Sequence, residues 1–244
     1  MRLDLCTWPE VEAYLESSDG VLLPTGSTEQ HGPIGLIGTD SLCANDIALD
    51  AGDRSGALVA PVIGYTPAAF NMGFPGTLSV SPETMRAVVS EVVDGLIHHG
   101  FGHIYILNGH GANLEPIRAA VEDKLAWIRV RSWWDFKAVN VLRDHFYGDW
   151  EGMHATPSEV AITQARYRRV EADDLGPPQK LSPDFVKAHA GDRHGPPEEH
   201  RAAFPDGRVG SHSSLATPEH GRAIFEAACA AVAKDYRAFV EDRV

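Results

Sequence analysis

Short apolar runs alternate along the chain with longer segments in which apolar residues recur at helical spacing. The runs, each bounded by glycine, proline or polar residues, lie at residues 20–24, 57–63, 103–107 and 128–134. The helical segments lie at residues 40–51, 82–99, 114–126, 153–168 and 218–240. Continuous apolar runs are typical of buried parallel strands, and strands that alternate with helices indicate an α/β fold. We therefore predict a mostly parallel central sheet with helices on both faces.

Residues 176–214 do not follow either periodicity. This stretch is rich in proline, glycine, histidine and aspartate, and we expect long loops folded back on the body of the protein. Within it, residues 188–200 carry His189, His194 and His200. A solvated loop is favoured there over a histidine-rich metal site.

Length and charge narrow the class of protein. The 244 residues are 43% hydrophobic and 23% charged, which fits one soluble globular domain over residues 1–244. The net charge of -13 argues against nucleic acid or an anionic membrane as partner, because both are bound by clustered Lys and Arg. No apolar stretch approaches the roughly 20 residues of a membrane span. Three widely spaced cysteines, Cys6, Cys43 and Cys229, are expected to be reduced thiols, so we predict a cytoplasmic protein.

The loop after the first predicted strand carries candidate metal ligands. Glu29, His31 and Asp40 fall within twelve residues, and one imidazole with two carboxylates suits Zn²⁺, Mn²⁺ or Fe²⁺. A carboxylate such as that of Asp40 can bridge two ions about 3.5–4 Å apart, where water becomes a nucleophile at neutral pH. Taken singly, Asp40 could instead be a helix N-cap, Glu29 could cap a turn, and His31 could be an ordinary loop histidine.

The loop after the third predicted strand supplies a second histidine. His110 follows this strand directly, between glycines that let the backbone approach a ligand. The carboxyl ends of parallel strands meet at one edge of the sheet, so His110 could face the first loop. Asn113 is more simply interpreted as the N-cap of the next helix.

A third segment, residues 153–159, could supply acid–base groups. Pro157 and Ser158 could open a helix, with Glu159 as an acid in its first turn. The functional interpretation makes Glu159 a further ligand and His154 the general acid that protonates a leaving nitrogen, because a histidine pKa lies near the working pH. Trp133 and Trp134 follow the fourth strand, and one of them could wall a pocket while the other lies in the core.

These motifs together resemble the creatininase (creatinine amidohydrolase) family. The resemblance is carried by GSTEQHG and GTD at 26–40, NGHGAN at 108–113 and HATPSE at 154–159. It implies a creatininase-like α/β fold and two divalent metal ions per subunit. The ligand set that it implies is Glu29, His31, Asp40 and His110, with Asp40 bridging, while His154 moves protons and Glu159 lies nearby.

The resemblance also implies hydrolysis of an amide or cyclic amide C–N bond in a small molecule, and a homo-oligomer, commonly a hexamer. One position departs from the pattern: creatininase carries an acidic ligand two residues after the histidine of the second loop, and this chain has Ala112. Either Glu159 or water then completes the shell of the second ion, or that ion is weakly held. A peptidase of a small modified peptide, a hydrolase of a polyol and a catalytically lapsed metal-binding protein are the alternatives.

Overall fold

The core of the protein is a four-stranded parallel sheet. The computed structural model describes residues 1–241, and in it β1 (Gly20–Thr25), β2 (Leu58–Val59), β3 (His103–Asn108) and β4 (Ile128–Ser132) lie in the order β2-β1-β3-β4. All three pairings are parallel, with Leu22 opposite Tyr105 and Ile106 opposite Val130. Every residue of β1 is buried, as expected of a strand covered on both faces.

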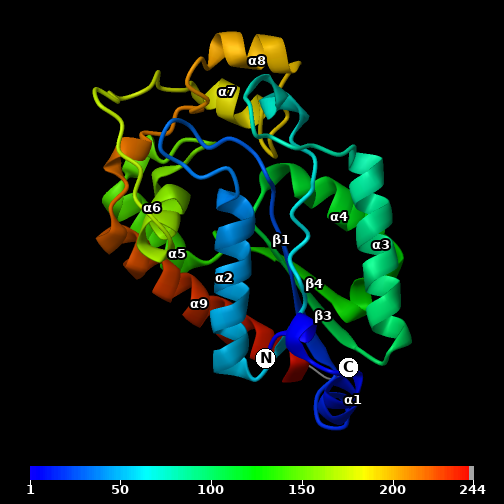
Figure 1. Cartoon of the computed structure of the whole chain (residues 1–244). Helices are drawn as coiled ribbons and strands as arrows, with labels where there is room; N and C mark the ends of the chain where they lie inside the picture. The colour runs from blue at the N-terminus through cyan, green and yellow to red at the C-terminus, as the bar shows by residue number, and fades with distance from the viewer. Residues whose placement is uncertain (242–244) are drawn as a thin grey trace.

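Helices cover both faces of this sheet, which confirms the predicted fold class (Figure 1). Alternate strand residues enter separate cores: Leu22 and Tyr105 point to one, while Val21 and Ile104 point to the other. The first core is closed by α2 (Thr39–Ser55), α5 (Lys137–Phe146), α6 (Pro157–Arg166) and α9 (Pro218–Glu241). The second is closed by α1 (Trp8–Leu15), α3 (Pro82–His98) and α4 (Leu114–Val121).

Several elements differ from the sequence prediction. The second strand is only two residues long, because the chain turns away after Val59 and touches β1 again through a single bridge from Ile63 to Thr25. Helix α4 ends at Val121 and continues as a 3-10 helix, and α6 begins at Pro157 rather than at Met153. The 3-10 helices are Leu3–Leu5, Ala69–Gly73, Gly111–Asn113, Glu122–Trp127, Gly148–Trp150 and Ser213–Leu215.

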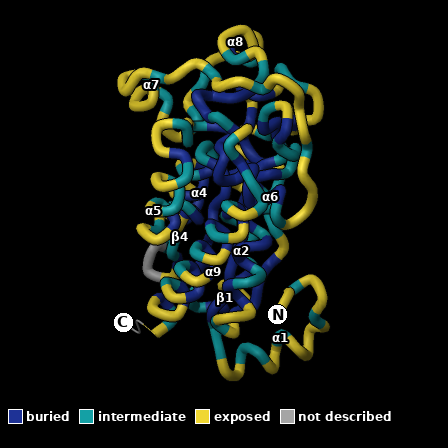
Figure 2. Tube along the Cα trace, turned by 90° about the vertical axis from the view of Figure 1, so that its left-hand side faces the viewer, coloured by how far each residue is buried: buried dark blue, intermediate teal, exposed yellow. Residues whose placement is uncertain are grey.

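The stretch predicted as long loops contains two short helices. These are α7 (Pro183–Ala188) and α8 (Pro197–Ala203), and they lie beyond the carboxyl ends of the strands, far from both termini (Figures 1 and 2). Their outer surfaces are largely exposed (Figure 2). Residues 183–204 are called the cover below. Over residues 1–241 the structure offers no helix with the length and apolarity to span a bilayer.

The closest helix packing brings α9 against α6. Gly221, in the first turn of α9, is buried against the backbone of Ala161, and a methyl group there would collide with the Ala161 carbonyl oxygen. Neither backbone can shift without disturbing the buried helix α6. Glycine at position 221 therefore sets how close the two helices lie.

We predict that Gly221→Ala lowers the free energy of unfolding by about 2–4 kcal/mol, because overpacking a buried contact forces the backbones apart. Urea denaturation measures this change. Gly95→Ala is the matched control, because Gly95 lies inside α3 with no atom within 4 Å of an added methyl group. There the better helix propensity of alanine should stabilise the protein by roughly 0.5–1 kcal/mol. Equal effects of the two substitutions would contradict this account.

Candidate metal centre

Two loops from adjacent strands meet at the carboxyl edge of the sheet. The loop after β1 carries Glu29 and His31 and leads into α2, while His110 follows β3 after one glycine. The loops are held together at their roots, where the Thr25 hydroxyl donates to the Asn108 side-chain oxygen at 3.1 Å. The four side chains predicted to converge, those of Glu29, His31, Asp40 and His110, are therefore brought together.

The carboxylate of Asp40 lies between the two histidines. Its Oδ1 is 2.9 Å from Nε2 of His31, and its Oδ2 is 3.1 Å from Nδ1 of His110. Atoms that bind one ion at 2.0–2.2 Å lie roughly 3–3.6 Å from each other. Each oxygen of Asp40 thus has a histidine at the distance expected of two ligands of one ion, which is the arrangement of a bridging carboxylate.

The remaining carboxylates complete two groups around Asp40. Glu29 joins Asp40 and His110, and its Oε1 is 3.4 Å from Nδ1 of His110. Glu159 joins Asp40 and His31, and its Oε1 is 3.6 Å from Nε2 of His31. All five residues are buried. The two groups share Asp40 and could hold two cations side by side.

A third group combines Glu29 and His31 with His154. Nδ1 of His154 is 3.4 Å from Oε1 of Glu29, and all three residues are buried. His154 thus reaches the cluster from the segment before α6. The geometry fits a proton carrier at the edge of the centre and also fits a ligand.

Each of the three histidines has one ring nitrogen tied to a backbone carbonyl. Nδ1 of His31 lies 3.1 Å from the Glu29 oxygen, Nε2 of His110 lies 2.8 Å from the Pro67 oxygen, and Nε2 of His154 lies 2.8 Å from the Gln30 oxygen. A carbonyl oxygen only accepts, so these nitrogens carry the hydrogen. When such a ring is neutral, its other nitrogen points into the cluster with a free lone pair, as in metal-binding histidines.

The carboxylates lack the donors that buried carboxylates normally have. Within residues 1–241, three of their oxygens have no hydrogen-bond partner: Oε1 and Oε2 of Glu29 and Oδ2 of Asp40. Burial raises the pKa of Glu29 to about 8 and that of Glu159 to about 7. Burial lowers the pKa of His31, but the Asp40 and Glu159 carboxylates outweigh it and raise that pKa to about 10. This donor set fits divalent cations, which would supply the missing charge.

Of the simpler structural interpretations, the one for Asp40 is wrong, the one for Asn113 is confirmed in position only, and the one for Glu159 holds together with the functional one. Asp40 is not an N-cap, because α2 is capped at Gly38 and Asp40 points into the cluster from the first helical turn. Asn113 occupies the N-cap position of α4 but does not cap it: its amide donates to the Gly26 carbonyl at 2.8 Å. Glu159 does accept from the Thr156 N–H at 2.6 Å in a capping box while also facing His31.

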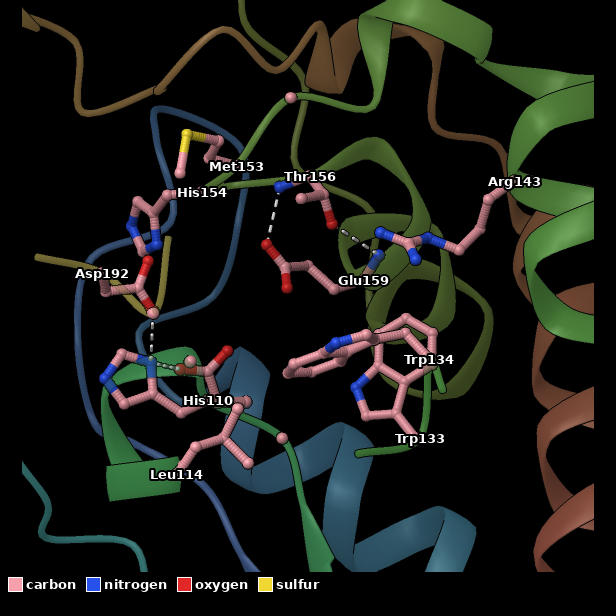
Figure 3. A pocket seen from close by; sticks show the side chains of 15 residues that line it. His110, Leu114, Trp133, Trp134, Arg143, Met153, His154, Thr156, Glu159 and Asp192 are labelled. Carbon is pink, nitrogen blue, oxygen red and sulfur yellow. Dashed lines mark hydrogen bonds and ion pairs between the residues drawn. The ribbon is translucent and has the colours of Figure 1, made fainter. Parts of the chain in front are cut away.

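A pocket opens onto the cluster (Figure 3). It exposes parts of Asp40, His110, His154 and Glu159, and its walls include Leu114, Trp133, Trp134, Arg143, Met153 and Asp192. Trp133 is almost completely buried and belongs to the core, while Trp134 is partly exposed, so both indoles line the pocket in an edge-to-face pair. The prediction that one tryptophan lies in the core and the other walls a pocket is therefore confirmed only in part, because Trp133 does both.

Most of residues 188–200 are exposed, as predicted for a solvated loop, but His194 and His200 turn inward from the cover. Phe70 lies beneath it, with ring centroids 4.7 Å from His194 and 5.1 Å from His200. His200 and the His194 side chain are buried. No metal group in the described part of the chain includes these histidines. They pack as aromatic rings instead.

Sequence reasoning missed three residues that contact the site. The side-chain N–H of Gln30 donates to the side-chain oxygen of Asn71 at 2.7 Å. The amide nitrogens of Gln30 and Asn71 lie 3.0 and 3.1 Å from Nε2 of His154. Asp192 reaches Nδ1 of His110 from the cover, at 3.8 Å. Gln30 lies inside the predicted motif and could have been included, whereas Asn71 and Asp192 lie in segments without a motif.

The fold and the cluster together define a class of protein: an α/β sheet with a buried carboxylate–imidazole group that can hold a pair of divalent ions at its carboxyl edge. The family model for creatininase, described as creatinine amidohydrolase, matches residues 4–236. This chain belongs to the creatininase family of hydrolases.

Individual relatives agree with this assignment. Creatinine amidohydrolase of Pseudomonas putida is 30% identical over 181 residues, which cover 66% of this chain and 70% of the relative. Mycofactocin precursor peptide peptidase of Mycobacterium ulcerans (strain Agy99) is 28% identical over 231 residues, covering 90% and 81%. A mutant creatininase complexed with creatine superimposes with a TM-score of 0.79 at 25% identity, over 97% of each chain. The family thus contains both amidohydrolase and peptidase members.

We predict that Asp40→Asn abolishes tight binding of divalent metal at both positions, because one carboxylate faces both groups. Loss of an outer-shell partner costs roughly 10–100-fold in affinity, and loss of a shared ligand should exceed this. Elemental analysis after gel filtration and calorimetric titration with Zn²⁺ measure the effect. Asp46→Asn is the matched control, a second buried carboxylate on α2 that binds Arg166 and Tyr167 instead. Unchanged metal content in Asp40→Asn would contradict a bridging role.

We also predict that acid destabilises the protein through His200. Burial and the neighbouring His189 lower its pKa to about 4, against about 6.5 in the unfolded chain. The unfolded state then binds more protons between these values, so stability is full above pH 6.5 and is lost as the pH falls toward 4, by up to about 3 kcal/mol. Urea denaturation from pH 7 to 5 should show a steeper loss for the wild type than for His200→Phe, which keeps a ring against Phe70. Parallel slopes would exclude His200 as the cause.

Proposed function

We propose that this protein is a metal-dependent amidohydrolase that cleaves a C–N bond of a small amide or cyclic amide. The observation that carries the proposal is the division of the Asp40 oxygens between two histidines, beside an open pocket that also reaches His154. The family relationship supports hydrolysis, and the relationship to creatinine amidohydrolase supports an amide substrate.

Two groups of residues would hold the ions. Glu29, Asp40 and His110 form one position, and His31, Asp40 and Glu159 form the other. Zn²⁺, Mn²⁺ or Fe²⁺ fit these donors, and a bound pair would polarise the scissile carbonyl and lower the pKa of water. Glu159 is held for this task by its capping bond to Thr156, which fixes its carboxylate toward His31.

His154 is placed to move the protons. Its Nε2 hydrogen is held by the Gln30 carbonyl, so Nδ1 is the atom that can accept a proton. Burial, together with the charge of His31, holds the pKa of His154 well below its usual range, so the ring is neutral at neutral pH. The neutral ring can take a proton from attacking water at Nδ1 and return it to the departing nitrogen.

The pocket indicates the size and character of the substrate. Its walls combine apolar surface from Leu114, Trp133, Trp134 and Met153 with the guanidinium of Arg143. Arg143 is held by Glu151 at 2.9 Å and Asn140 at 2.8 Å. Flat, partly polar molecules of a few heavy atoms, such as cyclic amides and formamides, suit such walls.

A peptidase acting on a small modified peptide is the second candidate. It is supported by the peptidase relative, whose alignment covers 90% of this chain. A hydrolase of a polyol, or a protein that binds metal without turnover, would need the same cluster. A single domain over residues 1–244, assembly into a homo-oligomer such as a hexamer, and a cytoplasmic location remain predictions.

A substrate screen tests the proposal. The metal-loaded protein is incubated with cyclic amides, formamides, short C-terminal peptides and polyol ketones, and products are detected by mass spectrometry. Release of an amine or opening of a ring amide supports the proposal. Cleavage of peptides alone would support the peptidase instead, and two bound metals per chain without any turnover would support a binding protein.

We predict that His154→Ala lowers kcat by roughly 10²–10⁴-fold, the usual contribution of a proton-transferring side chain. Metal content should stay at the wild-type value, because neither metal group that shares Asp40 needs His154. His145→Ala, on the exposed surface of α5, is the control and should leave both quantities unchanged. Loss of one metal equivalent in His154→Ala would instead make His154 a ligand.

A further inference from the structure

The cover inserts one carboxylate into the candidate metal centre. Asp192 lies between α7 and α8, and its Oδ2 is 3.8 Å from Nδ1 of His110 (Figure 3). Only one tenth of its side chain is exposed. It lies on the side of His110 that also faces Glu29 and Asp40, the two carboxylates of the first metal group.

The two segments are shaped for this approach. A methyl group on Gly111 would collide with the Asp192 carboxylate, so a larger residue at position 111 would displace that carboxylate from His110. Asp192 itself adopts a left-handed backbone with φ of 56°, a conformation that Asp and Asn tolerate better than other residues with a side chain. The surrounding contacts thus hold this side chain in place.

The charges around Asp192 favour a bound cation. In residues 1–241 its ion-pair partners are two histidines, His110 and His194, and no Lys or Arg. Independently, both oxygens of Glu29 are buried without a hydrogen-bond partner in this part of the chain. Glu29, Asp40 and Asp192 all approach Nδ1 of His110, and a divalent ion at that nitrogen would offset the repulsion among the three carboxylates.

We propose that Asp192 is a fourth protein ligand of the metal position formed by Glu29, Asp40 and His110. The loop that carries His110 has no carboxylate of its own at Ala112, and the cover supplies one from a segment eighty residues further along the chain. This inference rests on the proposed metal-dependent function, and it makes the cover part of the metal centre.

Calorimetric titration of the metal-free protein with Zn²⁺ tests this assignment. Asp192→Asn should weaken one of two binding events by at least tenfold and leave the other near its wild-type affinity. The retained event shows that the variant is folded. Asp174→Asn is the matched control, because Asp174 has the same left-handed φ of 56° but is exposed on the surface. It should behave as the wild type.

The outcomes separate this inference from the proposed function. Two unaltered binding events in Asp192→Asn would overturn the role of Asp192 while leaving the metal centre intact. Equal weakening of both events would also overturn it, because that is the result of a general disturbance. A wild-type protein that binds no Zn²⁺ or Mn²⁺ would remove the metal centre itself. Recovery of the weakened event on adding Ala112→Glu to Asp192→Asn would support the assignment further.

Discussion

The site depends on one buried carboxylate placed between two imidazoles. Asp40 stands in the first turn of α2, where the partial positive charge of the helix N-terminus favours an anion. Burial alone would raise the pKa of Asp40, but His31 and His110 outweigh it and hold that pKa below its usual range. Glu29 has no comparable donors in the described chain, and leaving a buried carboxylate uncompensated costs several kcal/mol. Folding of this edge and binding of cations are therefore linked.

Close backbone packing makes this arrangement possible. A methyl group on Gly26 would collide with the backbone of Ser41, and one on Gly109 would collide with the carbonyl of Asp40. Both glycines let the start of α2 lie directly against the ends of β1 and β3. The strand ends are joined by the bond from Thr25 to Asn108, so the ligand-bearing loops cannot separate without breaking the sheet edge. The precision of the cluster comes from the sheet, not from the loops alone.

The sequence predicted correctly those features in which the local residue pattern agrees with the position of that segment at the end of a strand. Parallel strands imply a common carboxyl edge, and polar side chains directly after two strands imply a site there, so the convergence of Glu29, His31, Asp40 and His110 could be inferred. Asn113 occupies the predicted N-cap position but makes no capping bond, because its amide donates to the distant Gly26 carbonyl. Helices α7 and α8 are too short to show a helical period, and the burial of His194 and His200 depends on Phe70, more than a hundred positions away. No local pattern contains that information.

The cover and the sheet edge are stabilised in different ways, and this difference affects how substrate specificity can change. The edge is fixed by backbone bonds of the sheet, whereas the cover is fixed by aromatic packing of His194 and His200 on Phe70 and by the contacts of Asp192. Such surface segments tolerate change in sequence and length better than a sheet does. The hydrolytic groups can then be retained while the walls of the pocket change, as expected of a family whose members include an amidohydrolase and a peptidase. Asp192 of the cover also lines the pocket. If Asp192 is a metal ligand, a change in this part of the pocket wall alters the metal affinity of one position. Substrate choice and metal binding are then not independent in this chain.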